Sequence, residues 1–394
     1  MSEQLRVGMV GYAFMGATHS LAWRTVNRAF DLPLSARMTA VSGRSPEGVA
    51  AAAAKLGWDE HTTDWQSLIA RDDIDLIDIC TPGDTHAEIA LAALAAGKHV
   101  LCEKPLANTV AEAKEMAAAA AKAASSGLRA MCAFNYRRVP AVALMRQLVQ
   151  DGRIGTIRHV RASYLQDWIV DPQFPLVWRL RKELAGSGAL GDIGAHIIDL
   201  TQFVTGQSIT KVSALTETFV KSRPLPSASS GLSASAAESF GDVTVDDAAL
   251  FLARLDGGAV ATYEATRFAT GRKNALRVEL NGSLGSLAFD FERLNELEFY
   301  DAALPASEQG FSRILVTEPE HPYMAAWWPP GHGIGYEHTF THEVRDLIED
   351  IANGRQPTPS FADALQVQLV LDAVSRSAES AQWTAVEPAL EPAV

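Results

Sequence analysis

Short apolar segments alternate with helical segments along the N-terminal part of the chain. The apolar segments are residues 5–10, 37–43, 73–80, 98–104 and 128–134, and stretches of helix-forming composition separate them. Parallel strands require long crossover connections, which are usually helices and are right-handed. This order of segments therefore predicts a doubly wound parallel sheet of the α/β class.

The pattern changes after residue 134. Longer strand-like runs follow, and an Asp-Gly-Gly turn at 256–258 and an Asn-Gly turn at 281–282 are typical of antiparallel hairpins. The segment 222–240 is rich in Ser, Ala and Pro, so we expect a mobile excursion between strands there. The second part is predicted to be an α+β domain with a large, mostly antiparallel, open sheet.

A glycine-containing loop, residues 11–16, joins the first strand to the first helix. Gly11 permits a tight turn, Gly16 permits close approach of helix and strand, and a helix N-terminus can hold a pyrophosphate. Ala13 stands where a dinucleotide fingerprint has its middle glycine, so the match is imperfect. The position between strand and helix predicts a Rossmann domain. The residues expected to contact the dinucleotide are Gly11, Ala13, Phe14, Met15 and Gly16. We assign residues 1–133 to this dinucleotide-binding domain and residues 134–394 to a substrate-binding and oligomerisation domain.

The end of the second strand bears on the choice of dinucleotide. An NAD enzyme usually places an acidic residue here, on the ribose 2′-hydroxyl. This chain instead has Ser42-Gly43-Arg44-Ser45. A guanidinium and hydroxyl groups suit a 2′-phosphate, although an arginine at a helix start is also an ordinary solvated residue. The segment favours NADP as the cofactor, with NAD as the alternative.

Two further strands end in segments suited to a ligand site. Ligands of open α/β sheets bind at the carboxyl ends of the strands, so both segments face one crevice. The proline after Lys104 restricts its backbone, and a desolvated lysine has a lowered pKa that suits proton exchange with a hydroxyl group. A surface lysine with a solvated ammonium is the alternative. The residues of this crevice expected to bind the cofactor are Thr81, Pro82, His86, Glu103 and Lys104.

A second set of polar residues lies in the glycine-rich segment 185–200. Asp192, His196 and Asp199 are spaced i, i+4, i+7, which predicts one shared helix face. Histidine carries protons near neutral pH, and a carboxylate one turn away can orient it or bind a substrate hydroxyl. Simple packing of the histidine is an alternative. No third strong ligand with suitable spacing follows, so no metal site is predicted.

Composition excludes several classes of protein. The net charge is −13 and no basic stripe is visible, which argues against nucleic-acid binding. Cys80, Cys102 and Cys132 lack metal-type spacing and read as reduced core residues of a cytoplasmic protein. No run approaches the roughly 20 apolar residues needed to span a membrane, and no segment reads as a secretory signal.

Four motifs together resemble the Gfo/Idh/MocA family of oxidoreductases: residues 11–16, Glu103-Lys104-Pro105, Asn135-Tyr136-Arg137 and residues 191–196. The resemblance covers essentially the whole chain. It implies hydride transfer between a nicotinamide and a sugar or polyol carbon. Lys104 matches the family's EKP lysine, and Asp192 and His196 match its D-x-x-x-H pair. The stretches AFNYRR, YLQDW, AGSGALGDI and EATR resemble a member that oxidises the C3 hydroxyl of a sugar with NAD.

We expect the sugar to bind between the two domains. His196 or Lys104 takes the hydroxyl proton, a choice that spacing does not decide, and Asp192 positions the sugar. Aromatic faces suit sugar rings, although packing or subunit contact is an equal alternative for each tryptophan. The expected substrate-binding residues are Lys104, Tyr136, Arg137, Trp168, Arg179, Asp192, His196 and Tyr336, with Trp178, Trp327, Trp328 and His332 as further candidates.

Two other functions compete with this hypothesis. A non-catalytic NAD(P)-binding sensor would need the glycine loop but not Lys104 and His196. An enzyme that retains its cofactor would oxidise and re-reduce a sugar, giving epimerisation or glycoside cleavage. In each case the open sheet face is expected to be buried in a homodimer or homotetramer, because such faces rarely stay bare.

Overall fold

A computed structural model describes residues 3–230 and 233–389 of the chain. Its N-terminal part contains a six-stranded parallel sheet in the order β3-β2-β1-β4-β5-β6. The predicted doubly wound sheet is therefore confirmed. The strands are β1 (Glu3–Val10), β2 (Leu34–Ser42), β3 (Glu60–Thr62), β4 (Leu76–Ile79), β5 (His99–Glu103) and β6 (Ala130–Ala133), and the helices between them are α1 (Phe14–Ala29), α2 (Pro46–Leu56), α3 (Trp65–Ile69), α4 (His86–Ala95) and α5 (Val110–Ala124).

Local chemistry accounts for these elements. β4 is buried along its whole length, as a central parallel strand must be. Helix α2 begins after Ser45, whose hydroxyl accepts the amide N–H of Gly48, and it ends at Gly57 with φ 87°. Helix α5 begins with a capping box between Thr109 and Glu112. All three cysteines are buried and free, as expected.

The C-terminal part contains a nine-stranded, mostly antiparallel sheet in the order β16-β15-β14-β13-β7-β12-β11-β8-β17. The exception is the parallel pair formed by β7 and β12. The predicted open sheet is therefore confirmed. Its strands are β7 (Ile157–Leu165), β8 (Ile209–Glu217), β11 (Ala248–Leu255), β12 (Val260–Thr266), β13 (Ala275–Gly282), β14 (Gly285–Asp290), β15 (Glu296–Asp301), β16 (Phe311–Leu315) and β17 (Thr384–Ala385).

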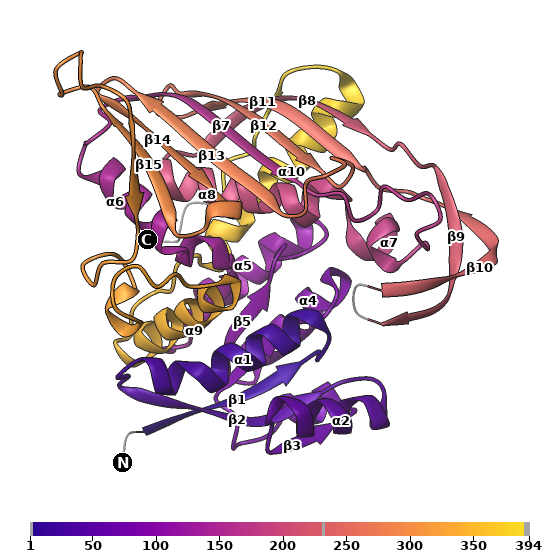
Figure 1. The fold of residues 1–394 in the computed structure, drawn as a ribbon. Coiled ribbons are helices and arrows are strands. Elements are labelled where there is room, and N and C mark those ends of the chain that lie inside the picture. Colours follow the sequence, from indigo (N-terminus) through magenta and orange to yellow (C-terminus); the bar gives the residue numbers. More distant parts are fainter. Residues whose placement is uncertain (1–2, 231–232, 390–394) are drawn as a thin grey trace.

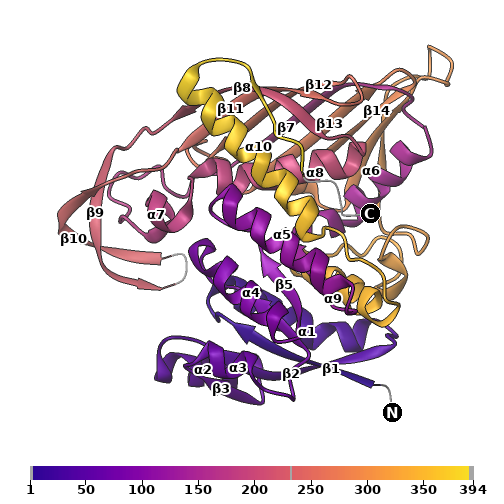
Figure 2. The same ribbon diagram turned by 180° about the vertical axis from the view of Figure 1, so that it is seen from behind.

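Helices cover one face of this sheet. Figures 1 and 2 show α6 (Pro140–Gln150), α8 (Ala195–Thr205) and α10 (Phe361–Ser380) on the side that faces the N-terminal sheet. The opposite face carries large exposed apolar side chains of β8 and β11, namely Leu215, Leu250 and Leu252. One face of the sheet is thus part of the core and the other is open.

Segment 222–240 lies between β8 and β11, as predicted for an excursion between strands, and its described residues form regular structure. Its mobility stays a prediction. β9 (Ser222–Ser230) and β10 (Ser233–Asp242) pair as a two-stranded antiparallel arm. Figure 1 shows the arm extending from the second sheet beside the N-terminal domain. Arg223 anchors its root, because the buried guanidinium donates to the carbonyl oxygens of Ile169, Asp171 and Phe174. Backbone pairing needs no large side chains, so a Ser- and Ala-rich segment is able to form it.

Helix α9 (Tyr336–Ala352) connects the C-terminal part to the first sheet. It packs along α1, and Figure 1 shows the two helices side by side. The buried side chains of α9 share one hydrophobic cluster with residues of β1, β2 and α1; they are Phe340, Val344, Leu347 and Ile348. The core of the N-terminal sheet is therefore completed from the end of the chain. None of the described helices is long and apolar enough to cross a membrane.

Candidate active site

The loop between β1 and α1 has the geometry of a dinucleotide cradle. Gly11 has φ 98°, and a Cβ atom there would lie 2.6 Å from the carbonyl oxygen of Cys80. A Cβ atom on Gly16 would lie 2.2 Å from the carbonyl oxygen of Gly11, so both glycines are needed for close backbone approach. Ala13 precedes α1 and provides no side-chain cap, which leaves the first amide N–H groups free for an anion. These features fit a dinucleotide pyrophosphate.

The carboxyl ends of β2 and β4 adjoin this loop. The amide N–H of Gly11 donates to the carbonyl oxygen of Ser42 at 2.9 Å. Arg44 is exposed beside this strand end. The Tyr12 ring lies against Gly43, where a Cβ atom would be 2.0 Å from a ring carbon. Tyr12 thus fills part of the space beside the segment that was expected to hold a 2′-phosphate.

Of the expected crevice residues, Thr81 and Pro82 follow β4 and lie partly exposed beside Gly11. His86 is different, because it is buried and both its ring nitrogens are used inside the protein. Nδ1 lies 3.0 Å from the carbonyl oxygen of Pro105, and Nε2 lies 2.9 Å from that of Thr81. His86 therefore joins two loops of the crevice from inside the protein, and it is not placed to contact the cofactor.

Lys104 follows β5 and crosses to the second domain. The Lys104–Pro105 peptide bond is cis. The ammonium donates to the backbone carbonyl oxygen of Asp192 at 2.8 Å and lies 3.4 Å from its carboxylate oxygen Oδ1. Asp192 lies in a π-helical turn, Leu190–Gly194, directly before α8. The amine of the first domain and the carboxylate of the second thus meet, although 88 residues separate them.

His196 lies one turn beyond, at the start of α8, in an aromatic pocket. Its ring centroid lies 4.6 Å from that of Tyr136, 5.9 Å from Tyr164 and 6.0 Å from Phe134. The residue is 7% exposed, and among the described residues its Nδ1 has no hydrogen-bond partner. Burial, followed by the nearby Lys104 charge, lowers the pKa of His196 well below 6.5. The imidazole is therefore neutral near pH 7 and able to accept a proton.

Asp192 stays ionised in this site. Burial raises its pKa, but the positive charges of Lys104, Arg267 and Arg179 outweigh burial and bring the pKa of Asp192 to about 2. Arg267 is fully buried, with Nη1 3.7 Å from the Asp192 carboxylate. The charged Asp192 is suited to accept a hydrogen bond from a substrate hydroxyl. The neutral His196 is suited to take a proton from a hydroxyl group.

The expected face shared by Asp192, His196 and Asp199 is only partly formed. Asp199 accepts from the Arg137 guanidinium, with Nε at 2.8 Å, and both side chains are buried. The π-helical turn shifts the spacing between Asp192 and α8, so an i, i+7 relation no longer places both carboxylates together. Arg137, expected to bind substrate, thus has its charge paired with Asp199 in the helical layer.

Several other expected substrate residues adjoin the Lys104, Asp192 and His196 group. The Tyr136 hydroxyl lies 2.7 Å from that of Tyr164, and burial raises the pKa of Tyr136 to about 12. Tyr336 lies 6.3 Å from Tyr136, ring centroid to ring centroid. Trp168 lies beneath the Arg267 guanidinium at 5.6 Å. Arg179 lies over Trp178 at 4.4 Å and within electrostatic reach of Asp192.

The tryptophans of segment 326–333 lie elsewhere. Trp327 packs against Phe30, which directly follows the C-terminal end of α1, while the glycine loop lies at the N-terminal end of this 16-residue helix. A helix of this length spans roughly 24 Å. Trp328 and His332 are exposed. The structure does not bring these three candidates to the group around Lys104.

Sequence reasoning missed Arg267, Tyr164 and Asn274. Arg267 ends the EATR stretch, and its spacing from Asp192 carries no local signal that the two residues meet. Tyr164 donates to the side-chain oxygen of Asn274 at 2.7 Å, which fixes the tyrosine pair beside His196. Only the pairing of β7 with β13 brings these two residues together.

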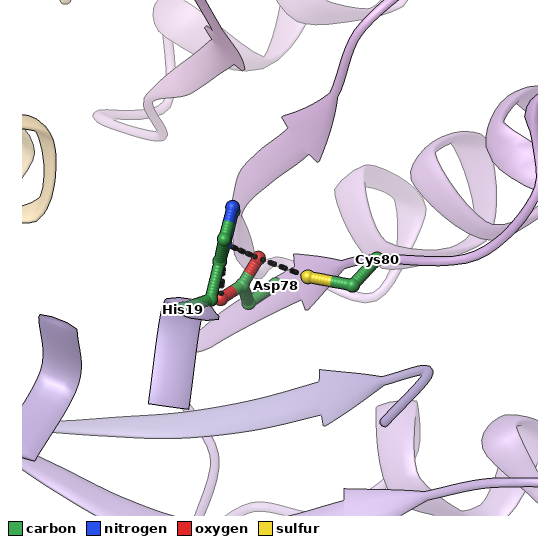
Figure 3. A group of neighbouring side chains, drawn as sticks. All are labelled: His19, Asp78 and Cys80. Atoms are coloured by element: carbon green, nitrogen blue, oxygen red, sulfur yellow. Dashed lines mark hydrogen bonds and ion pairs between the residues drawn. The ribbon is translucent and has the colours of Figure 1, made fainter. Parts of the chain in front are cut away.

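One group of potential metal ligands occurs among the described residues. Donor atoms of His19, Asp78 and Cys80 all lie within 4.8 Å of one another, and Figure 3 shows them converging. The His19 ring is already bonded on both sides, to Asp78 and to Glu103. The donor set fits an ion-paired cluster better than a metal centre. The absence of a metal site stays a prediction.

A dinucleotide cradle beside a lysine, a carboxylate and a neutral histidine defines a class, that of nicotinamide-dependent oxidoreductases. Comparison with known proteins agrees. Residues 5–128 match the model for an oxidoreductase family with an NAD-binding Rossmann fold, and residues 142–288 match the GFO/IDH/MocA C-terminal domain. The chain belongs to the Gfo/Idh/MocA family of oxidoreductases, as its motifs indicated.

Individual relatives narrow the type of reaction. Levoglucosan dehydrogenase of Pseudarthrobacter phenanthrenivorans is 42% identical over 98% of both chains, and inositol 2-dehydrogenase of Rhizobium meliloti is 26% identical over 95% of this chain and 96% of the relative. An oxidoreductase domain protein from Kribbella flavida is 63% identical, with a TM-score of 0.94 over 98% of this chain and 100% of that one. Levoglucosan dehydrogenase in complex with NADH and levoglucosan has a TM-score of 0.92, with 98% of this chain and 100% of that chain covered. The chain is an NAD-binding oxidoreductase of the sugar dehydrogenase type.

Proposed function

We propose that the protein oxidises a secondary alcohol of a sugar or polyol, at a C3 hydroxyl when the substrate is a pyranose, and passes the hydride to a nicotinamide cofactor. The observation that carries this proposal is the meeting of Lys104, Asp192 and His196 across the two domains. The likeness to a levoglucosan dehydrogenase that binds NADH and levoglucosan supports it. The proposed division of labour gives residues 1–133 the cofactor and residues 134–394 the substrate.

In this mechanism each residue has one task. His196 accepts the hydroxyl proton, because its imidazole is neutral and lies within electrostatic reach of Lys104 and Asp192. Lys104 donates a hydrogen bond to the same oxygen and stabilises the charge that develops there. Asp192 accepts a neighbouring hydroxyl and holds the Lys104 ammonium in place. The nicotinamide, when bound, supplies the hydride acceptor.

We propose NAD as the preferred cofactor, in place of the NADP that Ser42-Gly43-Arg44 favoured. The family model is an NAD-binding one, and levoglucosan dehydrogenase, one of the structural relatives, forms a complex with NADH. The position of Tyr12 against Gly43 adds a steric reason, because the ring narrows the space beside the second strand. Arg44 is exposed and stays available to solvent.

The assay that tests this function screens NAD and NADP against monosaccharides, anhydrosugars and inositols while reduced cofactor is followed by absorbance. Net reduction of NAD by at least one of these alcohols is the expected result. A protein that purifies with bound nucleotide and converts a sugar without net reduction supports the retained-cofactor alternative. Nucleotide binding with no turnover of any sugar supports the sensor alternative.

We also propose that the open face of the second sheet binds a second copy of this chain. Leu215, Leu250 and Leu252 line a hollow of about 840 Å³ on that face. Both basic and acidic side chains line this hollow, among them Arg161, Arg277, Glu264, Glu279 and Glu298. A two-fold contact brings one surface against itself, and such a mixed surface is complementary to itself. Light scattering is expected to show a dimer or tetramer that Leu252→Glu dissociates, and a monomeric wild type contradicts the proposal.

A further inference from the structure

His19 lies at the centre of a buried charged cluster that adjoins Lys104. Its Nδ1 lies 3.0 Å from both carboxylate oxygens of Asp78, and its Nε2 lies 2.9 Å from Oε1 of Glu103. Trp23 donates to Asp78 from the other side at 2.7 Å. His19 is 1% exposed and Asp78 is fully buried. No part of the proposed mechanism uses this cluster.

The contacts define the charge of the ring. An ionised carboxylate only accepts hydrogen bonds, so a ring bonded to carboxylates through both nitrogens donates from both and is an imidazolium. Burial lowers the pKa of His19, but the Asp78 charge and hydrogen bond raise it well above 6.5. One positive charge therefore lies between the two carboxylates of Asp78 and Glu103, which would otherwise repel each other.

Glu103 connects this charge to the active site. Its Oε1 faces His19, and its Oε2 accepts the backbone N–H of Lys104 at 3.0 Å. Each carboxylate oxygen thus has one donor, and the two donors lie in α1 and in the segment that carries the catalytic lysine. Lys104 in turn reaches Asp192 in the second domain. An unbroken series of contacts runs from Asp78 through His19 and Glu103 to Lys104.

We propose that His19 is a positioning residue for Lys104 and acts through the carboxylate of Glu103. This inference rests on the proposed function, because Lys104 is the group it positions. Removal of the imidazolium leaves two buried carboxylates without a counter-charge. Glu103 then turns away from Asp78 and releases the Lys104 backbone, which moves the ammonium relative to the substrate oxygen. The effect falls on turnover more than on sugar binding.

The first experiment compares His19→Gln with a matched control, His99→Gln. His99 is a histidine of the same domain, at the opposite end of β5, and its Nδ1 accepts the N–H of Arg129. His19→Gln is expected to lower kcat about 10- to 100-fold with KM changed less than threefold, as misplacement of a catalytic group does. His99→Gln is expected to keep kcat within twofold. A folded His19→Gln protein with wild-type kcat overturns the proposal.

A double variant separates a positioning role from a general loss of structure. Glu103→Gln offers only one acceptor oxygen, so it cannot serve His19 and Lys104 together. If His19 acts through Glu103, adding His19→Gln to Glu103→Gln lowers kcat by less than twofold further. Effects of the two substitutions that multiply in full contradict the proposal, because they show independent action.

A second readout needs no turnover and keeps the inference separate from the proposed function. Acetic anhydride acetylates free amines, and mass spectrometry measures the rate at Lys104 relative to other lysines. His19→Gln is expected to raise that rate at least threefold, because the ammonium loses its fixed contact with Asp192, whereas His99→Gln leaves it unchanged. An unchanged rate in folded His19→Gln overturns the positioning role even if no sugar is ever found to react.

Discussion

The cofactor end and the chemical end of the site differ in how the chain builds them. The cofactor cradle is formed by the consecutive residues 11–16. Its shape is set mainly by the backbone, because Gly11 and Gly16 allow the close approach of neighbouring backbone atoms. The chemical end joins Lys104 to Asp192 across 88 residues, and only tertiary packing brings them together. The glycines of a cofactor cradle therefore carry a local signal, whereas a reaction site depends on side chains that the fold assembles.

The largest effect is expected from substitutions at the chemical end of the site. Lys104→Ala and His196→Ala are each expected to lower kcat by roughly 10²- to 10⁴-fold, because each removes a group that handles the reacting oxygen or its proton. NADH binding, measured by fluorescence titration, is expected to change less than threefold for His196→Ala. Near-normal kcat in both variants would refute the assignment of the site.

The next largest effect is expected from a substitution at the cofactor end of the site. Gly16→Ala places a methyl group 2.2 Å from a backbone oxygen, and helix and strand must separate to accept it. We expect NAD affinity to fall about 10-fold or more, which corresponds to a loss of about 1.4 kcal/mol or more in binding free energy. Gly310→Ala is the matched control, since a Cβ atom there meets nothing within 4 Å. Equal NAD affinity in Gly16→Ala and wild type would show that the cradle does not depend on this contact.

A third test concerns the contact between the two parts at α9. Glu343 is fully buried, and burial, offset in part by Arg138, raises its pKa to about 8. The folded chain thus keeps a proton that the unfolded chain loses near pH 4.5. The stability this proton contributes is complete below that pH and is lost as the pH rises toward 8.

Glu343→Gln cannot ionise and should lack that loss. Its unfolding free energy is expected to decline less than that of wild type between pH 5 and pH 8, by on the order of a few kcal/mol. Urea midpoints across this range provide the measurement. Glu349→Gln, at a half-buried position of the same helix where the carboxylate pairs with Arg345, serves as control. Parallel pH profiles for wild type and Glu343→Gln would show that Glu343 is ionised at neutral pH.

The smallest expected effect sharpens the comparison at the cofactor end. Arg44 is exposed and pairs with a cofactor phosphate only if NADP is used. Arg44→Ala is therefore expected to change KM for NAD less than twofold. The contrary outcome has two parts: wild type uses NADP better than NAD, and Arg44→Ala loses most of its activity with NADP. That outcome would restore the first interpretation of Ser42-Gly43-Arg44, in which the segment binds the 2′-phosphate of NADP.

Much of the fold follows from the sequence because each element carries its own signal. The glycines of residues 11–16, the alternating strands of the second sheet and the motif at Lys104 all act locally. Arg267 and Tyr164 carry no such signal, since their roles arise from strand pairing and burial. Helical spacing alone predicted one face shared by Asp192, His196 and Asp199, whereas Asp192 lies in a π-helical turn and Asp199 pairs with Arg137.

The packing of α9 onto α1 has a consequence for synthesis on the ribosome. The first sheet emerges early, yet Phe340, Val344, Leu347 and Ile348, which close its core, are made near the end. Until then apolar side chains of β1 and α1 are open to water and to other chains, a state prone to aggregation. A fragment that ends at residue 133 should accordingly aggregate when it is expressed alone, and co-expression of the remaining segment should restore its solubility.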